Sequence, residues 1–98
     1  MKIDISSYQQ GLYKSAGGLI RVFLKEKDGK IDDILFTGDF FIFPEDSLNI
    51  IAQALKNVAL DKKIITDILN EVYLKENVDS PGVTPGDFAN ALMAATLG

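Results

Sequence analysis

Two spacings of apolar residues divide the chain near residue 44. Before that point apolar side chains recur at every second position, which is typical of strands with one buried face. After it they recur every three or four positions, which is typical of amphipathic helices. The order of the two patterns predicts an α+β domain in which three strands precede three helices.

The stretch 19–27 is the clearest strand, because apolar and basic side chains alternate along it. Residues 8–16 form a weaker candidate, joined to it through Gly17-Gly18, a pair able to supply the positive φ of a tight hairpin turn. The face predicted to be buried carries Ile20, Val22 and Leu24, and the opposite face carries Arg21 and Lys25.

The segment Lys27–Lys30 indicates a second hairpin turn, and the faces of the strands decide its length. A plain two-residue loop would set Leu24 opposite Asp33 and place a charge on the apolar face. A three-residue loop, 27–29, with a left-handed Gly29 and a bulge keeps the apolar faces together. We therefore expect the three-residue loop, which pairs Val22 with Ile34 and Ile20 with Phe36.

The first helix is predicted to begin near Pro44, a residue that suits a first helical turn. Glu45 and Asp46 complement the positive end of the helix dipole there. The apolar positions that follow have helical spacing: Leu48, Ile51, Ala52, Leu55 and Val58 or Ala59.

Capping residues mark the other two helices. Asp61 is placed as the N-cap of the second, whereas Thr84, Pro85 and Asp87 occupy the N-cap, first and third positions of the last. The alanine-rich last helix could approach another element closely. The predicted apolar stripes are Ile64, Ile65, Ile68, Leu69, Val72 and Tyr73 on the second helix and Phe88, Leu92 and Leu97 on the third.

The predicted architecture is therefore a three-stranded antiparallel meander followed by three helices packed on one face of the sheet. The other face is left to water or to a partner. With 98 residues, no internal repeat and no linker, we expect residues 1–98 to form a single domain.

Cysteine and histidine are both absent. Their absence excludes disulfides, Cys/His zinc sites, thiol nucleophiles and Ser-His-Asp triads. The adjacent carboxylates Asp32-Asp33 and Glu45-Asp46 point apart on a strand or a helix, so neither pair forms an acid/base dyad. We expect no catalytic residue and no metal site in this chain.

A net charge of -4 with scattered basic residues argues against a nucleic acid or an anionic membrane as the partner. No apolar run approaches the roughly 20 residues of a membrane span. Met1–Asp4 does not begin a signal peptide. We expect a cytoplasmic protein.

Three blocks of sequence occur in the order found in one known family: YKSAGGLIRV at 13–22, DGKIDDI at 28–34 and TGDFFIFPE at 37–45. Together they resemble the C-terminal accessory domain of lipoate-protein ligase A. The segment GVTPGDF at 82–88, with the alanine- and leucine-rich run behind it, is similar to the final helix of that domain.

The resemblance implies an accessory role. Members of this family activate lipoate with ATP and Mg²⁺ to lipoyl-AMP and join it to a lysine of lipoyl-acceptor domains, and the large domain holds the active site. A separate small chain implies an accessory subunit. By itself it would bind no ATP, Mg²⁺ or lipoate, and these would be present only in its complex with the large catalytic subunit. The family fold is similar to that of sulfur-acceptor and iron-sulfur scaffold proteins (SufE/NifU-like), whose chemistry needs the cysteines absent here.

The same resemblance points to residues that contact the catalytic subunit or its adenylate loop. Lys14 could reach a phosphate or carboxylate, or it could be a solvated strand lysine. Asp39 could meet a basic group of the partner, or it could cap the turn. Independently of the resemblance, the four phenylalanines within residues 36–43 exceed what one face of a short strand can bury, so Phe40 or Phe43 is the expected aromatic anchor, unless both fold under the first helix. The full set is Lys14, Gly17, Gly18, Gly38, Asp39, Phe40, Phe41, Phe43 and Pro44.

Two other functions remain open at this point. The chain could be an adaptor of the same fold that serves an unrelated complex through its aromatic surface. A small independent enzyme using Lys14 with a carboxylate ranks last.

Overall fold

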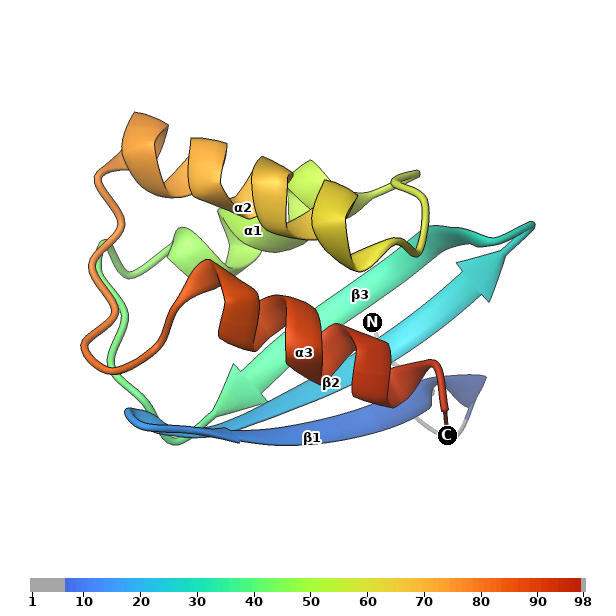
Figure 1. Ribbon diagram of the computed structural model, residues 1–98, viewed down its shortest axis with the longest axis horizontal. Helices are drawn as coiled ribbons and strands as arrows, with labels where there is room; N and C mark the ends of the chain where they lie inside the picture. The colour runs from blue at the N-terminus through green and yellow to red at the C-terminus, as the bar shows by residue number, and fades with distance from the viewer. Residues whose placement is uncertain (1–6, 98) are drawn as a thin grey trace.

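The computed structural model describes residues 7–97 and confirms the predicted α+β class (Figure 1). The strands form an antiparallel sheet in the order β1-β2-β3, and the three helices lie together on one of its faces. The elements are β1 (Gln9–Ser15), β2 (Gly18–Lys27), β3 (Lys30–Gly38), α1 (Ser47–Leu55), α2 (Lys62–Glu76) and α3 (Pro85–Ala95).

The core lies between the sheet and the helices, as the alternation in the strands predicts. Ile20, Val22 and Leu24 are fully buried on the covered face of β2. The α3 helix packs on β1 and β2, and α1 packs on β3. A Cβ at Gly11 would lie 2.4 Å from the backbone nitrogen of Ala95, so α3 touches the β1 backbone. The small residues of α3 therefore allow the close approach that the sequence predicts.

The predicted register of the second hairpin is wrong by two residues. The loop is the two-residue Asp28-Gly29, with φ of 54° and 76° as a type I′ turn requires. The irregularity lies inside β3, where Asp32 is passed over between the pairs Glu26↔Ile31 and Lys25↔Asp33. Because the bulge adds one unpaired residue to β3, the side chains of β3 that face the core are those predicted. Their partners on β2, however, are two residues away from the predicted ones. The observed pairs are Val22↔Phe36, Leu24↔Ile34 and Ile20↔Gly38.

The predicted start of the first helix is also displaced. The α1 helix begins at Ser47, and Pro44 precedes it in a turn. Both the N–H and the hydroxyl of Ser47 donate to the carbonyl of Pro44, at 3.0 and 2.6 Å. Pro44 thus closes the turn before the helix.

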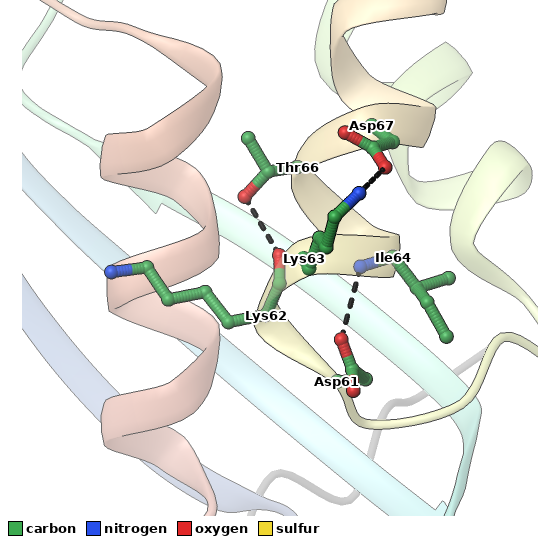
Figure 2. Close-up of polar contacts among 6 residues, drawn as sticks. All are labelled: Asp61, Lys62, Lys63, Ile64, Thr66 and Asp67. Atoms are coloured by element: carbon green, nitrogen blue, oxygen red, sulfur yellow. Dashed lines mark hydrogen bonds and ion pairs between the residues drawn. The ribbon is translucent and has the colours of Figure 1, made fainter.

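The predicted caps of the other helices are confirmed. The Asp61 carboxylate accepts from the N–H of Ile64 at 3.1 Å (Figure 2). Thr84 and Asp87 form a reciprocal capping box at the start of α3. The stripes are narrower than predicted, because Ile64 is 44% exposed and Leu97, which follows α3, is 90% exposed. Ile65 and Leu69 carry the buried stripe of α2.

Within residues 7–97, no helix combines the length and the apolar character that crossing a bilayer demands. The prediction about a signal peptide at Met1–Asp4 lies outside the described residues.

Removal of the α3 cap tests the local basis of the fold. Thr84→Ala leaves the N–H of Asp87 without its acceptor, so the free energy of unfolding in urea should fall by about 1 kcal/mol. Thr66→Ala is the matched control. Its hydroxyl donates only to the carbonyl of Lys62 within α2 (Figure 2), and alanine favours the helix, so its effect should stay within about 0.5 kcal/mol. Equal losses for the two variants would contradict the assignment.

Candidate functional site

Three segments that are distant in sequence meet at one end of the sheet. They are the turn between β1 and β2, the segment that follows β3, and the loop between α2 and α3, all on the left of Figure 1. The N–H of Gly17 donates to the carbonyl of Gly82 at 2.9 Å, and the N–H of Asp39 donates to the carbonyl of Leu19 at 3.0 Å. We call this meeting point the glycine crossing; its residues are Gly17, Gly18, Gly38 and Gly82.

A side chain at the glycine crossing would separate these backbones. A Cβ on Gly18 would lie 1.9 Å from the carbonyl oxygen of Asp39, and one on Gly17 would lie 2.2 Å from that of Pro81. Gly18 also has a φ of 138°, which other residues rarely adopt. The turn itself consists of Ala16 and Gly17, since Ser15 pairs with Gly18. The predicted turn pair is therefore shifted by one residue, but the need for a positive φ at Gly18 holds.

Lys14 and Asp39 flank the same residue of β2. Lys14 pairs with Leu19 on one side, and Asp39 bonds to Leu19 on the other. Both side chains are exposed. Within residues 7–97, neither forms an ion pair, and the Asp39 carboxylate accepts no hydrogen bond. The capping role considered for Asp39 is therefore not found, and both charges face solvent at this end of the sheet.

The phenylalanines near residue 40 divide between the core and the surface. Phe40 packs edge-on against the buried Phe88, with ring centroids 5.6 Å apart, as does Phe36 at 5.4 Å. Phe41 is 74% exposed and Phe43 54%. Of the two predicted anchors, Phe40 therefore turns into the core and Phe43 faces outward, joined by Phe41.

The loop between α2 and α3 completes the site and was not predicted to belong to it. Asp79 exchanges two backbone hydrogen bonds of 2.8 Å with Phe43, which fixes the aromatic segment against the loop. The buried Ser80 hydroxyl donates to the carbonyl of Val83 at 2.7 Å and therefore accepts from Tyr73, also at 2.7 Å. The pair Pro81-Gly82 marks a turn in the sequence. The hydrogen bond between Gly82 and Gly17, however, joins residues far apart in the sequence, and no pattern of neighbouring residues predicts it.

This end of the sheet exposes apolar and charged side chains together. Among the described residues, no group of three or more Asp, Glu, His or Cys side chains gathers as metal ligands would. What the site presents is two exposed rings, one free lysine and one free carboxylate, all held by a rigid backbone junction. Whether these residues contact a partner stays a prediction.

Comparison with known proteins defines the class. The model of the family described as bacterial lipoate protein ligase C-terminus matches residues 7–92, and the chain belongs to this family. Over 80 residues it is 44% identical to lipoate-protein ligase A subunit 2 of Thermoplasma acidophilum, with 82% of each protein covered. The resemblance inferred from the sequence motifs is thereby confirmed.

A solved structure shares the fold. It is that of an archaeal lipoylation system from Thermoplasma acidophilum, a bi-partite lipoate protein ligase and its E2 lipoyl domain. One of its chains matches with a TM-score of 0.77 at 40% identity, and the match covers 87% of this chain and 93% of that one.

Substitution of Gly18 tests the backbone contact at the glycine crossing. Gly18→Ala forces a Cβ against Asp39 at a positive φ and should lower the free energy of unfolding by about 3 kcal/mol. Gly29→Ala is the control, because Gly29 also has a positive φ but no atom lies within 4 Å of its added Cβ. Its loss should be about 1 kcal/mol. Similar losses in urea unfolding would show that close contact is not what requires Gly18.

The pH dependence of stability tests the Tyr73–Ser80 contact. Burial raises the pKa of Tyr73, so the folded state keeps a proton that the unfolded state loses above about pH 10. The stability that Tyr73 contributes is therefore complete below that pH and falls as the pH rises beyond it.

Tyr73→Phe should accordingly lower the free energy of unfolding by about 1 kcal/mol near neutral pH, through loss of the hydrogen bond. The difference from wild type should shrink above about pH 10. Tyr8, whose pKa is raised by its hydrogen bond to Asp33, is present in both proteins and cancels in the comparison. A difference that widens with pH would contradict the assignment.

Proposed function

We propose that this chain is the accessory, non-catalytic subunit of a two-chain lipoate-protein ligase. The observation that carries the proposal is the relative of matching length, which is itself named as subunit 2 of lipoate-protein ligase A. The likeness covers 82% of both chains, so it is not confined to a short motif. The second support is the bi-partite ligase whose chain shares the fold.

The partner in this proposal is the large catalytic subunit, and the docking surface is the end of the sheet at the glycine crossing. Aromatic residues, phenylalanine among them, are enriched in protein interfaces, and Phe41 and Phe43 project from a backbone fixed on both sides. Lys14 and Asp39, both unpaired within residues 7–97, add a charge of each sign beside the rings. Opposite charges at a rim set orientation more than affinity.

The reaction served is the ATP-dependent activation of lipoate to lipoyl-AMP, followed by transfer to a lysine of a lipoyl-acceptor domain. ATP, Mg²⁺ and lipoate would be held by the catalytic subunit, since the described residues of this chain bring together no cluster of carboxylates of the kind that holds Mg²⁺. The small chain would act by ordering the nucleotide loop of its partner, a step that aligns reacting groups and excludes water. Its contact with lipoyl-acceptor domains would be indirect.

Reconstitution tests the accessory role. Lipoate-dependent release of AMP should be low with the large subunit alone, absent with this chain alone, and restored when the two are mixed. The structural reason is that this chain supplies a docking surface and no reacting group. Full activity of the large subunit without its partner would overturn the proposal, as would a mixture no more active than the large subunit alone.

Truncation of the rings tests the docking surface separately. Phe41→Ala and Phe43→Ala should each weaken binding of the large subunit about tenfold, as loss of an aromatic anchor does. Leu97→Ala is the control, because Leu97 is 90% exposed and follows the C-terminal end of α3, which lies at the other end of the sheet from the α2–α3 loop (Figure 1). Activity restored at saturating variant would mean that the rings serve binding and not the chemical step. Unchanged affinity of both variants for the large subunit would show that the rings are not part of the interface.

A further inference from the structure

The outer edge of β3 carries unused backbone hydrogen-bonding groups. Hydrogen-bonded pairs alternate along an antiparallel ladder, and the bond from Asp39 to Leu19 fixes which residues of β3 face β2. Leu35 and Thr37 therefore bond to β2, whereas Ile34 and Phe36 direct their N–H and C=O groups outward. No other described segment pairs with them.

The protein itself pairs a short segment with the beginning of this edge. The N–H of Ile31 donates to the carbonyl of Val58 at 2.9 Å, and the N–H of Asn57 donates to the carbonyl of Ile31 at 2.7 Å. The pairing includes the bridge Lys30↔Ala59 and extends no further along β3. The same edge is thus competent for strand pairing, and it is open from Ile34 onward.

A groove of about 450 Å³ lies along this open edge. One wall is α1, which contributes Leu48, Asn49 and Ala52, and the floor is the backbone of β3 from Asp33 to Phe36. The opposite wall carries the rings of Tyr8 and Phe23. An edge strand beside a helix is an arrangement in which an extended peptide can add to a sheet and place alternate side chains in pockets.

The charges of the groove are unequal. Asp33, Glu45 and Asp46 line it against a single lysine, Lys56. That lysine lies 3.9 Å from Asp33, which also accepts the hydrogen bond of Tyr8. Glu45 and Asp46 have no basic side chain within ion-pair distance in residues 7–97. The end of the groove next to the start of α1 is therefore acidic and unpaired.

We propose that this groove binds an extended segment of another polypeptide that alternates apolar and basic side chains and pairs with β3 at Ile34 and Phe36. Its apolar side chains, which all point to one side of the extended segment, contact the rings of Tyr8 and Phe23, and a basic side chain on the other side lies at Glu45 and Asp46, beside α1. Pairing of a second copy of this chain is disfavoured, because it would bring the same carboxylates together at a net charge of -4 per chain. The inference does not depend on the ligase assignment.

The experiment uses the full chain and two short peptides, one alternating lysine with valine and the other glutamate with valine. Hydrogen exchange of the Ile34 and Phe36 amides is followed by NMR at millimolar peptide. The lysine peptide should slow both amides at least about fivefold, whereas the glutamate peptide should not. No slowing, or equal slowing by both peptides, would overturn the proposal.

A pair of double variants tests the charge. Glu45→Gln with Asp46→Asn should weaken binding of the lysine peptide about threefold to tenfold. Glu26→Gln with Glu71→Gln removes two exposed carboxylates outside the groove and should leave the affinity unchanged. Equal weakening in both double variants would show a general effect of net charge and overturn the site.

Amide exchange of Ile34 and Phe36 in the protein without peptide is a further test of the open edge. If the two amides already exchange slowly without peptide, the edge is filled by this chain's own residues or by a second copy, and the proposal fails. The two cases differ in that only the second depends on protein concentration.

Discussion

Direct contact between backbones at the glycine crossing is the constraint on which the structure of this end of the sheet depends. The turn between β1 and β2 touches the segment after β3 through Gly18 and the α2–α3 loop through Gly17. Such contact requires that neither residue carry a Cβ. It joins the end of the sheet to a loop more than 60 residues away in sequence, so strands and helices are fixed to each other there and not only through the apolar core.

The crossing also explains why a charge lies inside the most aromatic stretch of the chain. The sheet ends at Gly38, and Asp39 is the exposed residue at the point where the chain turns away. Beyond it the side chains alternate: Phe40 enters the core beside Phe88, Phe41 faces outward, Ile42 packs inward and Phe43 faces outward again. The alternation persists off the sheet because the backbone of Phe43 is held against Asp79. The proposed docking surface therefore consists of rings whose backbone is held in place.

Most of the architecture could be predicted from the sequence, because it follows from local patterns. Period-two alternation identified the covered face of β2, and the caps at Asp61 and Thr84 were visible as residue types. The predicted register of the second hairpin was wrong because two arrangements place the same side chains on the covered face. One has a bulge in the turn and the other has a bulge at Asp32, and the side-chain pattern alone cannot choose between them.

The site was harder to predict than the fold. Lys14 and Asp39 were predicted with the help of a family resemblance and the phenylalanines from their number within residues 36–43, whereas the division between Phe40 and Phe43 needed the structure. The loop containing Gly82 was missed as part of the site because its hydrogen bond to Gly17 joins residues with no shared local pattern. In a single sequence, the only sign of a long-range contact between backbones is an isolated glycine, which does not show what it contacts.

The two proposed surfaces adjoin each other along the chain. Phe43 belongs to the aromatic end, Glu45 and Asp46 line the groove at β3, and only Pro44 lies between them. Because the turn at Pro44 is closed by two hydrogen bonds from Ser47, the surfaces keep a fixed relation. One partner could therefore cover the rings and continue as a strand beside β3. Binding at both places by one chain would share a single cost of lost translational freedom, so two modest contacts could give a stable complex.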